Sequence, residues 1–349
     1  MKDSDYLYEI EDYKLFSPKI NLDALKNSSV FLTGGTGFLG KSLLDLFYFF
    51  NEEQRSNITI YILTRNEESF TREFPKFANH RNFVFLEGDI KSFVYPSVEF
   101  DYIIHAATEA DDSKIIHQPS EMFWNISKGT NHILEFCKLK NPKKFLFLSS
   151  GAVYGRQPPE LEKVSESYAG GPFLNDRKAS YAEGKRVGEF LCKFYEKEHG
   201  LNFSIARCFA FIGPFLPLSG AYAAGNFIYD VLKGQDIEIR GDGTDIRSYL
   251  YTFDLSFWLI TILLEKESGK IYNVGSDESI SILGIAEKIK FLSGAKSKIT
   301  VKGVKDPMKL PDRYVPSIDF AKQNLGLNIF TSLDETILQT LKFFEKSFT

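Results

Sequence analysis

From residue 28 onward, short apolar runs alternate with longer stretches of helical periodicity. The apolar runs lie at 29–34, 58–64, 82–89, 101–107, 144–150 and 203–209. Continuous runs of this kind are typical of strands that a parallel sheet buries on both faces. The helical patterns lie at 41–50, 125–139 and 182–200. The alternation predicts an α/β fold with a Rossmann-type, doubly wound parallel sheet.

After about residue 206 the pattern changes to a Gly/Pro/Ala-rich loop at 213–225 and short strands around a Gly-Asp-Gly turn at 236–255. We therefore expect an N-terminal surface extension over 1–27, a first domain over 28–206, and a smaller C-terminal α/β domain over 207–349. A strand at 269–275 could return to the first domain, and a helix is predicted at 281–293.

Composition narrows the classes of function. A formal net charge of −4 without a basic run argues against nucleic acid as a partner. The longest apolar runs, 46–50 and 257–264, are far shorter than the roughly 20 residues of a membrane span, and the acidic N-terminus lacks the apolar core of a secretory signal. The three cysteines are scattered, which favours a cytoplasmic protein, and the five histidines lack ligand spacing, so no metal site is predicted.

A glycine-rich loop, "TGGTGFLG", joins the first strand to the first helix, with Gly34, Gly37 and Gly40 at GxxGxxG spacing. The first glycine permits a tight turn, the second a close approach to a pyrophosphate, and the third close packing of helix on strand. The following N–H groups, with Phe38 and Leu39 among the contacts, favour bound phosphate. The loop therefore predicts a dinucleotide cofactor.

The end of the second strand indicates which dinucleotide. NAD-binding versions usually carry an acid there, whereas this chain has Thr64 and Arg65. Because an arginine can pair with a 2′-phosphate, NADP(H) is favoured, with NAD(H) as the alternative. Asp89 is placed to meet the adenine edge, and further cofactor contacts are expected at Ile90, Ala106 and Ala107.

Three residues suggest hydride chemistry on an alcohol or ketone. Ser150 ends the fifth strand, and Tyr181 and Lys185 stand four apart on one helix face. A tyrosine pKa near ~10 must fall by about three units for a base at neutral pH, which requires roughly 4 kcal/mol of phenolate stabilisation. The Lys185 ammonium one helical turn away is a source of that stabilisation, and Ser150 would hold the reacting oxygen.

Several stretches together resemble the extended short-chain dehydrogenase/reductases of the nucleotide-sugar epimerase/dehydratase family. They are "TGGTGFLG", "GDI", "HAA", "SSGAVYG", "YAEGKRVGE", "GDGTDIRSYLYTFDL" and "YNVGSDESISI", which span about residues 29–345. The motif "YAEGKRVGE" is most similar to the UDP-glucuronate decarboxylase branch. The resemblance implies a cytoplasmic enzyme of surface-polysaccharide or deoxysugar biosynthesis that acts on an NDP-sugar, commonly as a homodimer paired through a four-helix bundle.

Gly151 and Ala152 depart from part of that family. The 4,6-dehydratases carry Asp and Glu after the catalytic Ser/Thr, and the decarboxylases a glutamate at the second position, whereas neither residue here is an acid or base. Positioned acid–base groups contribute about 10²–10⁴-fold, so elimination is disfavoured. Hydride transfer at sugar C4 remains, by a 4-ketoreductase or 4-dehydrogenase, or alternatively a 4-epimerase. A dehydratase or decarboxylase would need acids from elsewhere, such as Glu109 or Glu183.

On the substrate side, the resemblance implies a diphosphate contact at Arg247 and a substrate contact at Asn226, for which a helix N-cap is the alternative. Thr108, Gly151 and Ala152 are expected to face the sugar. Ala210 and Ile212 replace the family's Asn-x-Tyr, which puts the usual sugar–diphosphate contact in doubt. A non-catalytic NAD(P)-binding regulatory module is the alternative outside enzymes, and its expected mark is a broken Tyr/Lys pair, which is intact here.

Overall fold

The computed structural model describes residues 6–108, 112–176, 179–220, 222–306 and 308–348. The chain forms two compact units. The first comprises Met1–Val153, Leu174–Arg207 and Ser256–Tyr272, and the second comprises Tyr154–Phe173, Cys208–Leu255 and Asn273–Thr349. Relative to the boundary expected at 206/207, Tyr154–Phe173 lies in the second unit and Ser256–Tyr272 in the first.

A seven-stranded sheet has the order β11-β6-β5-β4-β1-β2-β3. Its strands are β1 (Ser29–Thr33), β2 (Thr59–Thr64), β3 (Phe83–Glu87), β4 (Tyr102–His105), β5 (Lys144–Ser150), β6 (Phe203–Cys208) and β11 (Lys270–Val274). The β1–β2, β1–β4, β2–β3 and β4–β5 pairs are parallel. The predicted doubly wound fold is therefore confirmed, and the strand expected near 269–275 does join this sheet as β11.

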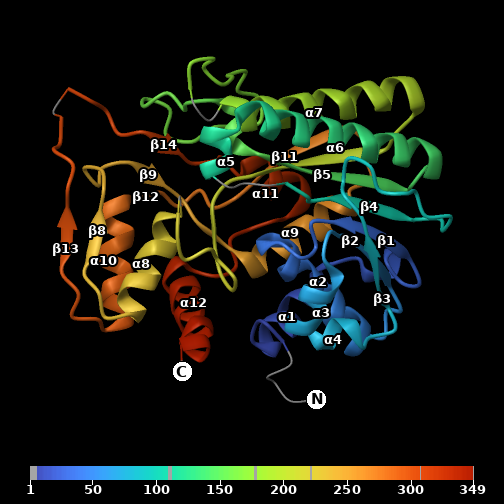
Figure 1. The fold of residues 1–349 in the computed structure, drawn as a ribbon, viewed down its shortest axis with the longest axis horizontal. Coiled ribbons are helices and arrows are strands. Elements are labelled where there is room, and N and C mark those ends of the chain that lie inside the picture. Colours follow the sequence, from blue (N-terminus) through green and yellow to red (C-terminus); the bar gives the residue numbers. More distant parts are fainter. Residues whose placement is uncertain (1–5, 109–111, 177–178, 221, 307, 349) are drawn as a thin grey trace. The chain divides into compact units, whose positions relative to one another are not determined.

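Helices cover both faces of the sheet (Figure 1). Figure 1 shows α2 with α3 and α4 on one side, and α6 with α7 on the other. The helices from the N-terminus to α7 are α1 (Ile10–Phe16), η2 (Ser17–Lys19), η3 (Leu22–Ala24), α2 (Phe38–Glu52), α3 (Glu67–Glu73), α4 (Pro75–Ala78), α5 (Asp112–His117), α6 (Pro119–Lys140), η4 (Gly151–Tyr154) and α7 (Ala179–His199). The three helices predicted from periodicity thus exist as α2, α6 and α7.

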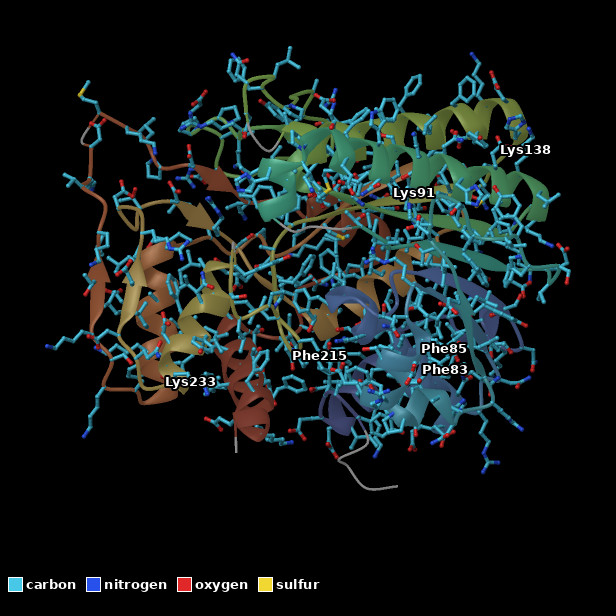
Figure 2. The ribbon with its side chains drawn as sticks, in the orientation of Figure 1. Phe83, Phe85, Lys91, Lys138, Phe215 and Lys233 are labelled. Carbon is cyan, nitrogen blue, oxygen red and sulfur yellow. The ribbon has the colours of Figure 1, made fainter. Side chains whose placement is uncertain are left out.

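Aromatic side chains fill the space between the sheet edge and its helices. Phe83 and Phe85 are two residues apart, so they lie on the same face of β3. Phe83 lies 5.2 Å from the ring centre of Phe77 on α4, and Phe85 lies 5.8 Å from Phe70 on α3 (Figure 2). These tilted ring pairs hold α3 and α4 against the edge strand.

The N-terminal segment, expected on the surface, is anchored to α2. Tyr6, Tyr8 and Tyr13 are all buried, and the Tyr13 ring stacks on Phe49 at 4.6 Å. The carboxylate of Asp45, 0 % exposed, accepts hydrogen bonds from the Leu7 N–H (2.9 Å) and the Tyr13 hydroxyl, and it pairs with Lys76 of α4. Side chains from residues 6–25 therefore contribute to the first unit's core.

The second unit contains three small sheets, with strand orders β10-β7, β12-β9-β14 and β13-β8. The strands are β7 (Phe211–Ile212), β8 (Ile237–Ile239), β9 (Ile246–Arg247), β10 (Leu250–Tyr251), β12 (Ile280–Ser281), β13 (Ile299–Val301) and β14 (Arg313–Tyr314). The helices are α8 (Ala223–Leu232), α10 (Ile282–Ser293), α11 (Asp319–Leu325) and α12 (Leu333–Phe348), while α9 (Thr252–Leu263) passes from the second unit into the first. Within the described ranges, every helix is too short or too polar to cross a bilayer.

Candidate active site

The glycine-rich loop makes a tight turn between β1 and α2. Gly34 has φ +74°, and a Cβ added there would lie 2.6 Å from the backbone of Ala106 and Ala107. The Gly37 N–H donates to the Gly34 carbonyl at 3.1 Å, and a Cβ on Gly40 would lie 2.1 Å from that same carbonyl. Only glycine lets β1, α2 and the end of β4 approach so closely.

This geometry leaves the start of α2 able to hold phosphate. Gly37 is the N-cap, and no side chain caps the helix, so the first N–H groups, including those of Phe38 and Leu39, have no partner within the helix. Backbone N–H groups and the helix dipole together favour an anion. The cradle therefore fits the pyrophosphate of a dinucleotide.

The adjoining strand end is tied to β1 through Thr33. Its hydroxyl accepts a hydrogen bond from the Ala107 N–H at 3.0 Å and contacts Nδ1 of His105 at 2.8 Å, while the Ala106 N–H donates to the Thr33 carbonyl at 3.2 Å. Ala106 and Ala107 thus present backbone directly beside the glycine loop, where the sequence predicts cofactor contacts.

The end of β2 carries no carboxylate. Thr64 is buried, and its hydroxyl accepts from the Asn66 N–H at 3.3 Å, whereas Arg65 is exposed. Asn66 in turn caps α3 by accepting the Ser69 N–H at 2.9 Å. The arginine therefore stands at the strand end as expected, with its side chain in solvent.

Asp89 and Ile90 follow β3. Asp89 accepts a hydrogen bond from the Lys91 N–H at 2.9 Å, and its side chain is 38 % exposed. Ile90 packs beneath Gly129 of α6, where a Cβ would lie 3.0 Å from the isoleucine. Asp89 is therefore accessible to a ligand, whereas Ile90 is part of the packing under α6.

Ser150 ends β5 with only 6 % of its surface exposed. The chain turns at once into η4, and the Ala152 N–H donates to the Ser150 hydroxyl oxygen at 3.2 Å. The residues of η4 are Gly, Ala, Val and Tyr, so no carboxylate stands directly after Ser150.

Tyr181 and Lys185 lie on the first turns of α7. The half-buried Tyr181 packs against a small apolar cluster of Ile115, Met122 and Ile126. Lys185 is 2 % exposed; its ammonium donates to the Leu148 carbonyl and to the Thr108 hydroxyl, both at 2.6 Å, and lies 5.0 Å above the Phe147 ring. The fold thus brings Thr108 and Lys185, 77 residues apart, into direct contact.

Glycines let α7 approach its neighbours. A Cβ on Gly184 would lie 3.1 Å from Ile126 of α6, and one on Gly188 would lie 2.6 Å from the Phe147 ring of β5. Because Lys185 sits between these glycines, its side chain is pressed onto β5 and points toward the strand's end. Close packing therefore fixes the direction of the ammonium group.

A buried histidine adjoins this lysine. His105 stacks on Phe147 at 5.6 Å and contacts Thr130 of α6 through Nε2 at 3.3 Å. Burial, and secondarily the Lys185 charge, lower the pKa of His105 to about 3. The imidazole is therefore neutral at physiological pH.

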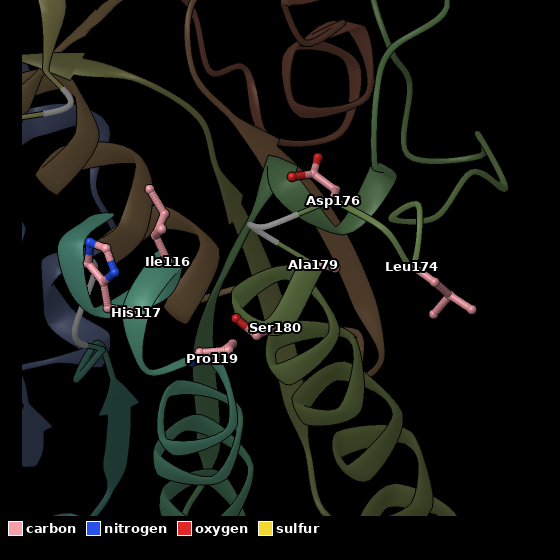
Figure 3. Close-up of a pocket in the computed structure, with 7 residues that line it drawn as sticks. All are labelled: Ile116, His117, Pro119, Leu174, Asp176, Ala179 and Ser180. Atoms are coloured by element: carbon pink, nitrogen blue, oxygen red, sulfur yellow. The ribbon is translucent and has the colours of Figure 1, made fainter.

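A pocket opens at the start of α7, lined by Ile116, His117, Pro119, Leu174, Asp176, Ala179 and Ser180 (Figure 3). The Ser180 hydroxyl is buried without a hydrogen-bond partner among the described residues. Sequence reasoning did not identify this pocket, because α5 and the segment before α7 have no motif that marks them as neighbours.

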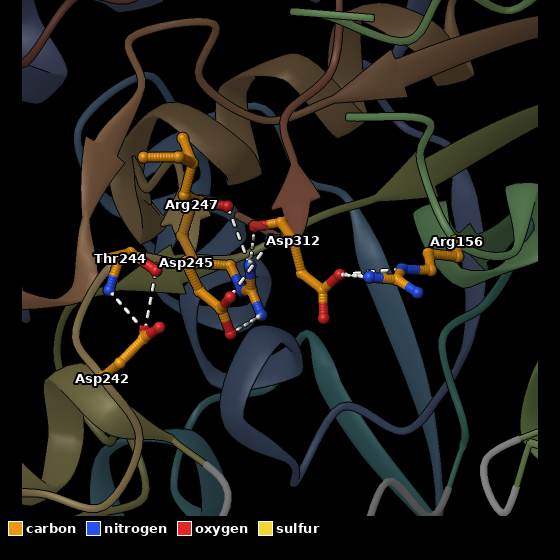
Figure 4. Close-up of polar contacts among 7 residues, drawn as sticks. Arg156, Asp242, Thr244, Asp245, Arg247 and Asp312 are labelled. Atoms are coloured by element: carbon orange, nitrogen blue, oxygen red, sulfur yellow. Dashed lines mark hydrogen bonds and ion pairs between the residues drawn. The ribbon is translucent and has the colours of Figure 1, made fainter. Parts of the chain in front are cut away.

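Arg247 of β9 lies in a cluster of acids and carbonyls in the second unit (Figure 4). Its Nη1 donates to the Ile246 carbonyl at 2.8 Å and the Asp312 carbonyl at 3.0 Å, and its Nη2 lies 3.7 Å from Asp245. Asp312 also binds Arg156, so the two arginines share one residue of the β14 segment. Of these residues, the sequence analysis predicted a ligand contact for Arg247 only.

Asn226 lies inside the first turn of α8, because the helix begins at Ala223 with Tyr222 as its N-cap. Its amide donates to the Gly220 carbonyl at 3.0 Å. The alternative that Asn226 caps the helix is therefore wrong, and a substrate contact stays a prediction.

The two carboxylates considered for elimination differ. Glu109 falls outside the described residues. Glu183 lies 3.6 Å from Arg186 and two positions after Tyr181, so the helix turns it by about 200° from the tyrosine's face. Glu183 therefore points away from the Tyr181–Lys185 face.

The sequence is similar to known nucleotide-sugar enzymes. The model of the "NAD dependent epimerase/dehydratase family" matches residues 30–275. UDP-glucuronic acid decarboxylase 1 of Xenopus tropicalis is 29 % identical over 320 residues, which cover 91 % of this chain and 72 % of that protein.

Solved structures share the fold. UDP-glucose 4-epimerase of Thermotoga maritima superposes with a TM-score of 0.79 at 21 % identity, over 92 % of this chain and all of that one. dTDP-glucose 4,6-dehydratase of Bacillus anthracis, in complex with NAD, gives 0.77 at 20 % identity, over 91 % and 97 % of the two chains. At these identities the likeness establishes the fold alone.

Proposed function

Because this chain belongs to the NAD dependent epimerase/dehydratase family, we propose that it transfers hydride at C4 of a nucleotide-sugar, as a 4-ketoreductase or 4-dehydrogenase. The observation that carries the proposal is the composition of η4. Ser150, Tyr181 and Lys185 provide for hydride transfer, whereas Gly151 and Ala152 provide neither acid nor base for a further step.

Each of the three residues has one task. In reduction, Tyr181 gives its phenolic proton to the oxygen on C4, and in oxidation it takes that proton back. The Lys185 ammonium, which donates to the Leu148 carbonyl and the Thr108 hydroxyl, stabilises the phenolate. Ser150 donates a second hydrogen bond to the C4 oxygen and aligns it.

NADP(H) is the proposed cofactor, with NAD(H) as the alternative. It supplies or accepts the hydride when bound. Gly34, Gly37 and the N–H groups of Phe38 and Leu39 would hold its pyrophosphate, and exposed Arg65 would pair with a 2′-phosphate. Thr64, Asp89, Ile90, Ala106 and Ala107 would line the rest of its site.

The substrate contacts stay proposals as well. Thr108, Gly151 and Ala152 would meet the sugar, where the small side chains leave room for the ring. Arg247 would bind the diphosphate through its fork of N–H groups, and Asn226 would add a contact. Arg247 is 29 % exposed on its side chain, which leaves it accessible to an anion.

Decarboxylation is a second candidate, favoured by the 29 % identical decarboxylase. Oxidation at C4 of a sugar with a C5 carboxylate creates a β-keto acid, whose loss of CO₂ needs less acid–base help than elimination of water. The missing glutamate at Ala152 therefore weakens this candidate without removing it.

We further propose a homodimer in the cytoplasm, paired through α6 and α7. Four large apolar side chains on these two helices are exposed: Trp124, Leu139, Phe190 and Phe194. Exposed apolar side chains on two adjacent helices suit a helix–helix interface, since two copies would join four helices. The free thiols Cys137, Cys192 and Cys208 suit a reducing compartment.

The decisive experiment incubates the purified protein with a panel of NDP-sugars, their 4-keto derivatives and either cofactor, and follows NAD(P)H absorbance and product mass together. A product two mass units heavier or lighter, matched by cofactor turnover, is expected for this two-electron reaction. Loss of water or CO₂ would reject the ketoreductase, and an isomer of unchanged mass without net cofactor turnover would indicate an epimerase.

A Tyr181→Phe variant is the control for the mechanism. It should bind cofactor as the wild type does and lose about 10²-fold or more in turnover, because only the proton donor is removed. Undiminished turnover would rule out Tyr181 as the acid–base group.

A further inference from the structure

A buried polar cluster lies on the α7 face that carries Tyr181 and Lys185. Glu189 of α7 accepts hydrogen bonds from the Ser149 hydroxyl of β5 at 2.6 Å and from Arg207 of β6, through Nε at 3.0 Å and Nη2 at 2.7 Å. Glu189 is 9 % exposed, and the arginine side chain 12 %. One carboxylate thus joins a helix to two neighbouring strands.

The cluster is in register with the catalytic residues. Tyr181, Lys185 and Glu189 follow one another at intervals of four, so they lie along one stripe of the helix. Lys185 bonds the Leu148 carbonyl, and Glu189 bonds the next residue, Ser149. The residue after that is Ser150, so two neighbouring turns of α7 are attached to the last residues of β5 before Ser150.

Polar contacts add direction to the close packing of α7. The Phe147 ring of β5 packs directly against Gly188, where a Cβ would lie 2.6 Å from the ring. A planar guanidinium against a carboxylate fixes distance and direction at once. The Glu189–Arg207 pair therefore adds a directional contact between α7 and β6 to that packing.

We propose that Glu189 is a positioning residue for the hydride-transfer reaction: through Ser149 and Arg207 it fixes α7 against the end of β5, the strand that Ser150 terminates, and so sets the position of Tyr181 and Lys185 relative to Ser150. This inference rests on the proposed function of those three residues. A shift of about 1 Å between reacting groups costs on the order of 10²-fold in rate. The proposed phosphate cradle lies on β1 and α2, whereas this cluster lies on α7, β5 and β6.

Two variants separate positioning from simple stability. Glu189→Gln keeps the shape but removes the charge. In the double variant Glu189→Met/Arg207→Met, apolar side chains of similar length replace the buried pair, a change that often preserves or raises stability. Lys193→Gln is the matched control, since it removes an exposed ion pair with Glu196 on the same helix.

The measurements are thermal unfolding, the dissociation constant of NADPH and NAD+, kcat and KM over pH, and the near-ultraviolet phenolate titration of Tyr181, taken as wild type minus Tyr181→Phe. For both Glu189 variants we expect cofactor affinity within about threefold of wild type, kcat lower by about 10- to 100-fold, and the phenolate midpoint moved to higher pH. The double variant should recover thermal stability without recovering kcat. Lys193→Gln should match the wild type within about twofold.

A double variant that recovers kcat together with stability would overturn the proposal, as would Glu189→Gln with an unmoved phenolate midpoint. A different result would contradict the proposed function itself: Tyr181→Phe would keep its turnover, whatever the Glu189 variants do. The phenolate titration needs no substrate, so the positioning role is tested even before the sugar is identified.

Discussion

Replacing Gly34 by alanine should destroy the cofactor site while leaving the fold largely intact. Gly34 has φ +74°, and its new Cβ would lie 2.6–2.7 Å from three backbone atoms of Ala106 and Ala107. Neither neighbour can rotate away, because their N–H groups are bonded to Thr33. The loop itself must therefore move off the end of β4.

The loss of stability in Gly34→Ala has two parts, backbone strain and overpacking, and a substitution at a second glycine separates them. Gly200 has φ +70°, yet nothing lies within 4 Å of its ideal Cβ. Gly200→Ala should therefore carry only the left-handed backbone penalty, about 1–2 kcal/mol. Gly34→Ala adds overpacking of about 1–3 kcal/mol, so it should unfold at lower temperature than Gly200→Ala.

Cofactor affinity gives the sharper contrast. Losing two charge-assisted hydrogen bonds to phosphate, at about 1.5–3 kcal/mol each, weakens binding by about 10²-fold or more. Titration of NADPH and NAD+ by calorimetry should show this loss for Gly34→Ala and an unchanged dissociation constant for Gly200→Ala. If Gly34→Ala binds either nucleotide within threefold of wild type, the phosphate cradle has been assigned to the wrong loop.

Three further outcomes follow from named contacts. Asp45→Ala should lower the free energy of unfolding by about 3–5 kcal/mol in denaturant titrations, because it leaves the partly buried Lys76 ammonium and two hydrogen-bond donors without their acceptor. Tyr13→Phe removes one hydrogen bond and should cost about 1–3 kcal/mol. Folding lowers the pKa of His105 from 6.5 to about 3, so as the pH falls below about 6.5 the unfolded chain binds a proton that the folded chain does not. The free energy of unfolding should therefore drop by about 2 kcal/mol between pH 7.5 and 5. His105→Gln should flatten the pH dependence of unfolding over this range. Arg65→Ser should weaken NADPH by about tenfold or more and leave NADH unchanged in a binding titration; equal effects on both would refute the 2′-phosphate contact.

Much of the first unit could be predicted because its strands, helices and glycine turn are each specified by residues that are close together in the sequence. Each strand of the large sheet is a continuous apolar run, and the glycine spacing encodes its own turn. The same locality explains why Lys185 was found: it shares a helix face with Tyr181. The partner of that lysine, Thr108, was predicted for a different role, because a contact across 77 residues leaves no periodic trace.

The residues whose roles the sequence did not predict, Glu189 and Asp45, have one physical cause in common. Glu189 stands inside the quoted motif "YAEGKRVGE", four residues after Lys185, so the signal was present. Its importance depends on Arg207 and Ser149, which come from two other strands and look like ordinary strand residues. Likewise, the sequence shows Asp45 only as a polar position on an apolar helix. The structure shows that the N-terminal segment covers it and donates hydrogen bonds to its carboxylate. Sequence patterns identify elements, whereas buried polar pairs depend on how elements meet.

The reaction's outcome then depends more on the substrate than on η4. Every reaction considered for this chain begins or ends with hydride transfer at C4, which the proposed function assigns to Ser150, Tyr181 and Lys185. With Gly151 and Ala152 behind the serine, η4 places no carboxylate there to direct what a C4 ketone does next. A C5 hydroxymethyl or methyl group would then leave the ketone intact, whereas a C5 carboxylate could lose CO₂ by its own β-keto chemistry. A cation facing C5, able to select a carboxylate, would therefore be the feature that separates a decarboxylase from a ketoreductase.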